Sequence, residues 1–422
     1  MNKIELFVYN RVKNNYIVKN LVRNIYQGFY DLLPNYESRF ITVPIVKENC
    51  YFGFHDLNPF SEDNSKILSN KLTIPLRMPT QNDLLDVGYW GGREFSSWNK
   101  LGETHAWNYH KGCRLQWLPK ERCIFNVERN GILRSEICDL DSSYTIIHWP
   151  IDTASHDGTV ATSFSYERLQ KMMPGYGYLF PDADSCINSP VSEGTGLYLV
   201  NLNNNTRDMV IDLKTLSLFH HEKSMDSAYH FVTHTEFSYD DRYISFLHRW
   251  YDGVNRHTRL IVYDRTTKEM YASPTTGMVS HYAWNRKGGI IAYCRVNDID
   301  SHVYFYNYKM EKYKRCGYPK LNSDGHHHFI DNDNFVVDTY PNKYRHAMLY
   351  KVNVNTDDVT LLADVRSFKK FASPSPDMHW ACDLHPRCSE DGTLISFDSV
   401  FTGKRSLCIM KLPKNNSGIT KR

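Results

Sequence analysis

The 422-residue chain carries 50 Lys and Arg against 47 Asp and Glu, which gives a formal net charge of +3. A charge so close to zero for this length provides no broad positive field, so we expect no nucleic-acid partner. Aromatic residues make up 14% of the sequence and favour strands over helices, because they suit a pleated, half-buried surface.

Residues 1–38 are expected to form a basic amphipathic helical extension. Apolar residues recur there at roughly helical spacing, with basic residues between them, as in Val8, Val12, Tyr16, Lys19 and Arg23. Such a helix can pack its apolar stripe on the main domain, which is the reading we favour. The alternative is peripheral contact of residues 1–35 with an anionic membrane surface.

The location expected from the sequence is the cytoplasm, with peripheral contact at the inner membrane as the open alternative. The N-terminal segment has neither the apolar run nor the cleavage site of a signal peptide. No stretch approaches the roughly 20 apolar residues of a membrane-spanning helix. The ten cysteines form no CxxC pair, and free thiols are the default in a reducing compartment.

From about residue 39 the pattern changes to short strands around polar turns. One unit recurs, in which a strand leads into a turn, often of the Ser-x-Asp type, and then into an alternating strand. It reads NPFSEDNSKIL from Asn58, LQWLPKERCIF from Leu115, IDTASHDGTVATSF from Ile151, EFSYDDRYISF from Glu236, AWNRKGGIIAY from Ala283, HFIDNDNFVV from His328 and HPRCSEDGTLISF from His385. This turn chemistry is typical of tight β-hairpins.

A second strand unit ending in a polar turn follows several of these hairpins. It begins at Gly196, Arg259, His302, His346 and Arg405. Two hairpins per repeat make a four-stranded blade, and repetition every 40–60 residues is typical of a propeller. We therefore predict an all-β fold, a seven-bladed β-propeller of antiparallel blades over residues 39–415, followed by a disordered tail at 416–422. Segment 168–195 is expected to be a long inserted loop.

Histidines precede the same turn in several repeats. In a propeller the innermost strands run along the channel, so residues at their starts converge even when they lie far apart in sequence. The residues at such places are His55, His234, His281, His326 and His385. Each single histidine can also simply bond a neighbouring blade. With Asp383, however, such imidazoles suit a borderline divalent metal, and we predict a metal site at His281, His326, Asp383 and His385. We expect manganese first, with zinc, iron or calcium as alternatives.

Other polar side chains are expected beside the histidines. Arg249 and Arg259 fall in the same repeat as His234, and arginine is suited to bidentate recognition of a carboxylate. Together with His55, His248 and Arg387 they are the predicted substrate-binding residues, and Tyr340 is a further candidate for the site. The alternative for the arginines is a surface ion pair, which contributes little to stability.

Three runs resemble segments of the oligogalacturonate lyases, which are TolB-like (PD40-type) seven-bladed propellers. They are HTEFSYDDRYISFLH, SHYAWNRKGGIIAY and DLHPRCSEDGTLISFDSVFTG, and the resemblance covers roughly residues 229–412. The whole chain is similar to uncharacterised bacterial propeller proteins associated with surface-polysaccharide genes, through runs such as ETHAWNYHKGCRLQWL and MMPGYGYLFPD.

The lyase resemblance implies roles for particular residues. It implies that His234 is the base that takes the C5 proton of a uronate, and that His281 and His385 bind the metal. Tyr340 or a water would then protonate the leaving oxygen. The family has a Gln and a His where this chain has Trp380 and Asp383, so its metal site is not preserved intact.

The function expected from the sequence is a metal-assisted lyase acting by β-elimination on an acidic oligosaccharide or polysaccharide of bacterial origin. Two alternatives stay open. One is a non-catalytic glycan- or protein-binding propeller in surface-polysaccharide biosynthesis. The other is glycoside hydrolysis or glycosyl transfer on the same scaffold, which would require a close pair of carboxylates such as Asp383 with Asp338 or Asp56.

Overall fold

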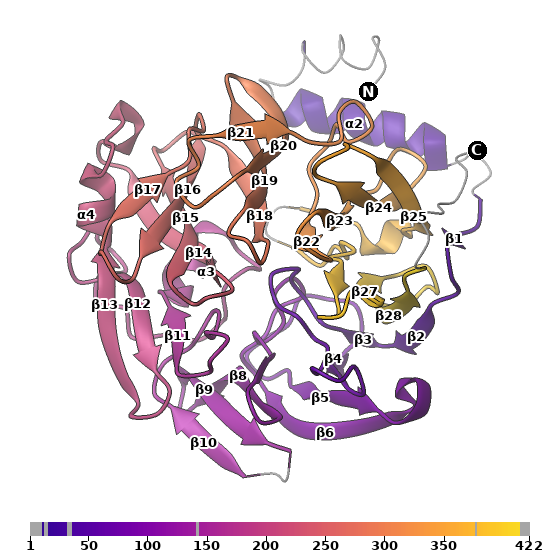
Figure 1. Ribbon diagram of the computed structural model, residues 1–422, viewed down its shortest axis with the longest axis horizontal. Coiled ribbons are helices and arrows are strands. Elements are labelled where there is room, and N and C mark those ends of the chain that lie inside the picture. Colours follow the sequence, from indigo (N-terminus) through magenta and orange to yellow (C-terminus); the bar gives the residue numbers. More distant parts are fainter. Residues whose placement is uncertain (1–10, 12–15, 32–35, 141–142, 376–377, 414–422) are drawn as a thin grey trace.

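Seven antiparallel sheets stand around one central axis in the computed structural model (Figure 1). The structure describes residues 11, 16–31, 36–140, 143–375 and 378–413, so the predicted tail at 416–422 and most of the first 15 residues lie outside it. The predicted seven-bladed β-propeller is confirmed.

The first three blades come from residues 50–212. Blade 1 contains β3 (Cys50–Tyr51), β4 (Ile67–Leu72), β5 (Leu85–Gly91) and β6 (Ser97–Thr104); blade 2 contains β7 (Gln116–Leu118), β8 (Arg122–Arg129), β9 (Ile132–Asp139) and β10 (Tyr144–Ile147). Blade 3 contains β11 (Val160–Ser163), β12 (Gly196–Asn201) and β13 (Thr206–Asp212). Its inner strand is reduced to an isolated bridge between Ala154 and Ala161, which is why the repeat looks irregular in this part of the sequence.

Blades 4 and 5 are the most regular. Blade 4 contains β14 (Tyr229–Phe237), β15 (Tyr243–Tyr251), β16 (Arg256–Asp264) and β17 (Met270–Ala272); blade 5 contains β18 (Val279–Trp284), β19 (Ile290–Val296), β20 (Ile299–Phe305) and β21 (Tyr313–Arg315). The core lies between neighbouring blades. Between blades 5 and 6, for example, Ala283 and Ile291 pack with Phe335 and Val337.

The N-terminal part of the chain completes the last two blades. Blade 6 contains β22 (His327–Phe329), β23 (Asn334–Asp338), β24 (His346–Asn353) and β25 (Val359–Arg366), with β1 (Arg39–Phe40) as a fifth strand. Blade 7 contains β26 (Arg387–Cys388), β27 (Leu394–Ser399) and β28 (Ser406–Lys411), with β2 (Ile45–Glu48) as its outer strand. Because β2 pairs with β28, a strand from residues 45–48 closes the ring.

The recurring Ser-x-Asp sequence locks the hairpin after the inner strand. The serine hydroxyl donates to the aspartate two residues on, at 2.7 Å in Ser61–Asp63, 2.6 Å in Ser155–Asp157, 2.6 Å in Ser238–Asp240 and 2.7 Å in Ser389–Asp391. Side-chain bonds of this kind favour turns over regular structure. The repeat seen in the sequence is therefore a repeat of turn chemistry.

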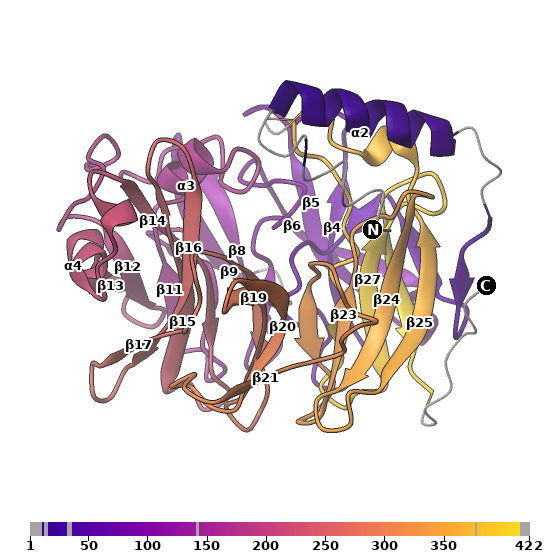
Figure 2. The same ribbon diagram turned by 90° about the horizontal axis from the view of Figure 1, so that it is seen from above.

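Helices are few: α2 (Tyr16–Asp31), α3 (Tyr166–Met172) and α4 (Leu213–Leu218), with short 3₁₀ turns at η1 (Arg93–Phe95), η2 (Lys223–Met225) and η3 (Lys369–Phe371). Figure 2 shows α2 lying across the face of the propeller that also carries α3. Asp31 of α2 accepts from the guanidinium of Arg345 at 2.6 Å, and Gln27 donates to the carbonyl of Lys343 at 2.9 Å. Within the described residues, no helix has both the length and the apolar character needed to cross a membrane.

Candidate functional site

The loop after β3 places Phe54 in the middle of the channel. The carboxylate of Asp398 accepts from the backbone N–H groups of Phe52 and Gly53, each at 3.0 Å, and Arg387 donates to the Gly53 carbonyl at 2.7 Å. Gly53 has φ +117°, a conformation that favours glycine. Phe54 and His55 are only 3% and 1% exposed, so these residues close the channel at this level.

Histidines from four different blades surround Phe54. Its ring centroid lies 4.8 Å from that of His234, 5.1 Å from His385, and 5.8 Å from both His281 and His326. The arrangement of the blades around one axis thus brings together the histidines that precede the same turn in several repeats. His55 completes the group, 5.2 Å from His326 and 5.6 Å from His281.

Two members of this histidine ring have left-handed backbones. His234 has φ +54° and His385 has φ +43°. A side chain held in this region is strained by about 1–3 kcal/mol, and such residues concentrate at functional sites. The Nδ1 atom of His234 lies 2.7 Å from the hydroxyl of Thr233, which fixes the ring orientation.

Buried carboxylates orient two of the other histidines. Asp338 contacts Nδ1 of His326 at 3.0 Å and accepts from the backbone N–H of His385 at 2.9 Å. Asp324 lies 3.2 Å from Nδ1 of His281. Burial lowers the pKa of His281 despite the Asp324 charge, whereas the Asp338 charge and hydrogen bond outweigh burial and raise the pKa of His326.

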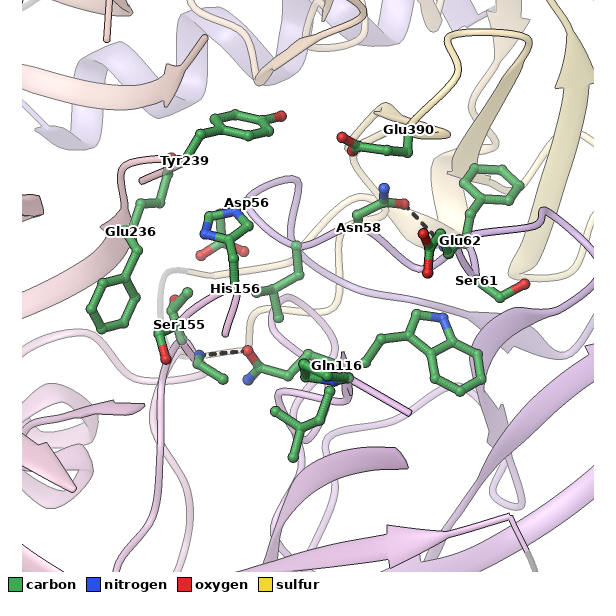
Figure 3. A pocket seen from close by; sticks show the side chains of 18 of the residues that line it. Asp56, Asn58, Ser61, Glu62, Gln116, Ser155, His156, Glu236, Tyr239 and Glu390 are labelled. Atoms are coloured by element: carbon green, nitrogen blue, oxygen red, sulfur yellow. Dashed lines mark hydrogen bonds between the residues drawn. The ribbon is translucent and has the colours of Figure 1, made fainter. Parts of the chain in front are cut away.

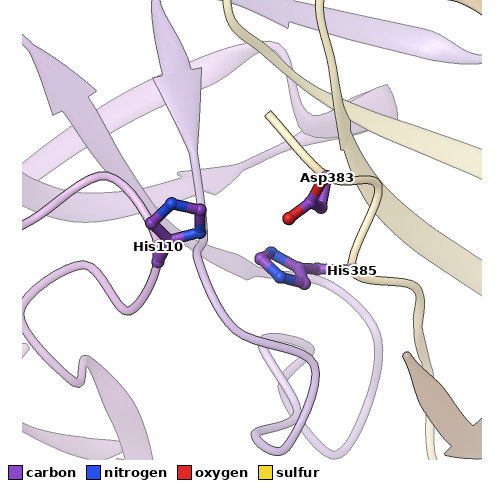
Figure 4. Close-up of side chains that lie close together, drawn as sticks. All are labelled: His110, Asp383 and His385. Atoms are coloured by element: carbon purple, nitrogen blue, oxygen red, sulfur yellow. The ribbon is translucent and has the colours of Figure 1, made fainter. Parts of the chain in front are cut away.

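The most compact set of possible metal ligands in the described residues is His110, Asp383 and His385 (Figure 4). One ligand atom from each lies within 4.8 Å of the other two. Donors about 2.0–2.2 Å from one ion lie at most about 4.4 Å apart, so the spacing of this set is close to what one ion requires. Two imidazoles and a carboxylate are a donor set that suits borderline divalent metals.

The protonation states of His385 and Asp383 also determine whether these residues can bind a metal. Burial and the neighbouring His326 hold the pKa of His385 well below its usual range, so the ring is neutral, as a ligand must be. Among the described atoms its Nε2 has no hydrogen-bond partner. Burial raises the pKa of Asp383 to about 6, which leaves the carboxylate available at neutral pH.

The predicted metal set and this set overlap in Asp383 and His385. His281 and His326 lie in the histidine ring with Nδ1 against Asp324 and Asp338, which leaves Nε2 as the nitrogen that could bind a metal, so their predicted role as ligands stays a prediction. His110, which the sequence analysis did not select, joins the set from the loop between blades 1 and 2. It contacts His379, and its ring stacks on Tyr176 with 4.8 Å between centroids.

Arg249 is a buried guanidinium without a protein counter-ion. It is 8% exposed, and in the described part of the chain no group forms a hydrogen bond or ion pair with it within ordinary distance; its Nε atom is fully enclosed. Burial lowers its pKa to about 10, and the adjacent Arg256 acts in the same direction. Arg249 also adds to the positive surroundings that hold the pKa of His234 low. Contact of Arg249 with a substrate carboxylate stays a prediction.

Two tyrosines lie against the histidines, Tyr176 against His110 and Tyr340 against His326. Tyr176 comes from the inserted segment after α3 and lies near the charges of Asp383 and Arg249. Tyr340 lies in the loop between β23 and β24, is 43% exposed, and packs edge-on against His326 with 5.7 Å between ring centroids. Its exposed position is compatible with the predicted contact with substrate.

Three other predicted substrate-binding residues use their polar groups within the protein. Arg259 donates to the carbonyl of Leu216 at 2.8 Å and to His248 at 3.1 Å, and His248 also lies 2.9 Å from His230. Arg387 pairs with Asp398 and is fully buried. The structure therefore gives Arg259, His248 and Arg387 supporting roles in place of substrate contact.

Comparison with known proteins gives a likeness of fold. No family model and no curated protein matches the chain. Oligogalacturonate lyase in complex with manganese is 12% identical over 91% of this chain and 96% of its own, with a TM-score of 0.43. TolB from Acinetobacter baumannii is 12% identical over 89% of this chain and 96% of its own, with a TM-score of 0.39. The tricorn protease is 10% identical over 90% of this chain and 34% of its own, with a TM-score of 0.51.

The chain shares the propeller fold of these proteins. At such identities the likeness concerns the fold alone, and the predicted resemblance to oligogalacturonate lyases and TolB-like propellers is confirmed at that level. The association with surface-polysaccharide genes stays a prediction.

Proposed function

We propose that the protein is a metal-assisted lyase that cleaves an acidic oligosaccharide by β-elimination at a uronate. One observation carries the proposal. The buried Arg249, which has no counter-ion among the described residues, lies close enough to His234 to affect its pKa. Tyr176 lies near both Arg249 and Asp383, and Asp383 forms the candidate metal site with His110 and His385. A buried unpaired charge is unfavourable for folding, so its presence favours a ligand that brings the opposite charge.

The reaction needs a base, a carboxylate partner and a proton donor. The C5–H bond of the uronate breaks and its proton goes to the base, while the electron pair forms the C4–C5 double bond. The C4–O bond then breaks, and the leaving oxygen takes a proton. Negative charge develops on the uronate carboxylate as the C5 proton leaves, so positive groups placed there lower the barrier.

The residues of this chain fit those roles. Burial, Lys111 and Arg249 hold the pKa of His234 well below its usual range, so its imidazole is neutral and able to accept a proton at neutral pH. Arg249 binds the carboxylate, with two parallel hydrogen bonds as the favoured geometry. Tyr340 protonates the leaving oxygen, with water as the alternative donor.

His110, Asp383 and His385 would hold the divalent metal, which when bound neutralises the uronate carboxylate and makes the C5 proton more acidic. We propose manganese, with zinc, iron and calcium as the alternatives to test. Asp338 and Asp324 contribute by fixing His326 and His281, which keeps the surrounding rings in place.

The carboxylate pairs considered for glycoside hydrolysis are otherwise engaged. Asp338 is used by His326 and His385, and Asp56 forms a bidentate pair with Arg114 at 2.8 and 2.9 Å. This favours elimination over hydrolysis. We also propose that the natural substrate is a surface polysaccharide and that the protein acts on it in the cytoplasm. Identifying the natural glycan tests this part of the proposal.

The test is the ultraviolet absorbance of the new C4–C5 double bond when the protein is incubated with short oligouronides and Mn²⁺. His234→Asn is the decisive variant, because asparagine tolerates the left-handed backbone. We expect a loss of at least about 100-fold. His156→Asn, which changes a half-exposed histidine paired with Asp241, is the matched control and should keep full activity.

Retained turnover in the His234→Asn variant would remove His234 as the base. Absence of product from galacturonate, glucuronate and mannuronate oligomers with each of the four metals would reject the lyase and favour the non-catalytic binding alternative.

A further inference from the structure

A cavity opens at the end of the channel opposite the histidine ring. The inner strands begin at the histidine ring and run towards the Ser-x-Asp hairpins; in β18, for example, His281 comes early and Trp284 is the last residue. Around those hairpins lies a cavity of about 860 Å³, within the range typical of small-molecule sites. Its wall includes Trp117 and Trp284, together with Asn58, Glu236, Tyr239 and Glu390 (Figure 3).

Buried side chains separate this cavity from the histidine ring. Phe54 and His55 fill the channel, and beside them Lys111 and Arg114 pair with Asp152 at 2.9 and 3.0 Å. The side chains of Lys111, Arg114 and Asp152 are fully buried. The cavity at the hairpin end is therefore a separate site and not an extension of the site around the histidine ring.

Carboxyl groups dominate the charged part of the cavity wall. Six lining residues carry a carboxyl group, whereas Lys120 is the single lysine or arginine among them. Three of the six have partners outside the cavity: Asp56 pairs with Arg114 at 2.8 Å, Glu121 with Lys66 at 2.5 Å and Glu390 with Arg286 at 2.6 Å.

Glu236 differs from these three. It is 9% exposed, lines the cavity, and forms an ion pair with no residue in the described part of the chain. Burial raises the pKa of Glu236 well above its usual range, and Asp56 and Asp152 add to the rise, while Arg114 and the backbone N–H of Trp284 oppose it. A buried carboxyl without a counter-ion is stabilised when a positive partner binds beside it.

The rest of the wall suits the body of such a partner. Phe60, Trp117 and Trp284 provide an aromatic surface on which an alkyl chain or a flat guanidinium can pack. The rim carboxylates of Glu62 and Glu390 are exposed and favour the approach of a cation.

We propose that this cavity binds an organic cation, an alkylammonium or guanidinium group, with Glu236 as its counter-ion. On binding, the carboxyl of Glu236 releases its proton to solvent and accepts hydrogen bonds from the cation. The site is independent of the lyase proposal, because none of its lining residues belongs to the histidine ring or to the set His110, Asp383 and His385.

The test is calorimetric titration of the full chain with agmatine and with 1,5-diaminopentane. Glu236→Gln preserves the shape of the protonated acid, so the variant should fold with unchanged melting temperature. We expect its affinity for the bound amine to fall at least about tenfold, as a charge-assisted hydrogen bond is lost. Titrations in two buffers of different ionisation enthalpy should show release of close to one proton by the wild-type protein and none by the variant.

His234→Asn is the control in the histidine ring and should bind the amines as the wild-type protein does. Equal affinity in the Glu236→Gln variant would overturn the proposal. So would the absence of binding of both amines at millimolar concentration, or binding of a neutral oligosaccharide in the cavity that does not depend on Glu236. Loss of lyase activity in His234→Asn with unchanged amine binding would separate the two sites.

Discussion

Asp338 holds His326 through both of its carboxylate oxygens, each of which lies 3.0 Å from Nδ1 of that residue. Its Oδ1 also accepts from the backbone N–H of His326 at 2.7 Å. The other oxygen also accepts from the backbone of His385. One buried carboxylate in blade 6 therefore fixes a histidine of its own blade and the start of the inner strand in blade 7.

Asp338→Asn is expected to lower the free energy of unfolding by about 3 kcal/mol, because it removes one partner of a buried pair. The raised pKa of His326 gives stability that is fully present below about pH 6.5 and is lost as the pH rises through the folded value. The Asp338→Asn variant should lack this pH-dependent change in stability. Denaturant unfolding at pH 6 and pH 9 measures the free energy of unfolding of both proteins. If the variant is destabilised equally at both pH values, the pairing of Asp338 with charged His326 is contradicted.

Arg249→Met should separate stability from function. Replacing a buried unpaired charge by an apolar side chain of similar length is expected to leave the melting temperature unchanged or raise it. Binding of oligouronide should be lost, since no bidentate donor remains. Thermal unfolding and equilibrium binding measure the two effects. A strongly destabilised variant would indicate that Arg249 has a structural partner.

Metal binding should weaken below pH 6. Burial raises the pKa of Asp383 to about 6, and the carboxylate must lose its proton to act as a ligand. We expect Mn²⁺ affinity to fall by about tenfold per pH unit below that value. Asp383→Asn should bind weakly and without this pH step. A titration curve that is flat between pH 5 and pH 7 would exclude Asp383 as a ligand.

Contact with a membrane can be tested on α2. Ile25 and Phe29 are 67% and 61% exposed on this helix, so at least these two apolar residues are not used for packing on the propeller. The double variant Ile25→Ser/Phe29→Ser should lose sedimentation with anionic vesicles. Val254→Ser changes an 80% exposed position in blade 4. It is the control and should sediment with the vesicles as the wild-type protein does. Absence of vesicle binding by the wild-type protein would reject the contact.

The blades and the histidine ring could be predicted because both follow the repeat. Each Ser-x-Asp hairpin marks the end of an inner strand, so residues a few positions earlier had to face the channel, as His234 and His281 do. His385, which directly precedes its inner strand, follows the same rule.

Residues outside the repeat could not be placed. His110 lies in a loop between blades and Tyr176 in the segment after α3, and only the tertiary structure brings them together. Phe54 precedes a histidine that was selected, but its place in the channel depends on Asp398 and Arg387 from the last blade. For His110, the nearest signal was its position in the aromatic run ETHAWNYHKGCRLQWL.

For the proposed lyase, the blocked axis of the propeller restricts how a sugar chain can move. With Phe54 and His55 across the middle, a substrate that reaches the histidine ring cannot pass through to the opposite face and must leave on the side from which it entered. Such a dead-end geometry favours fragments of a few sugars, or chain ends, over the interior of a long strand, and it makes departure of the product a candidate for the slow step of turnover.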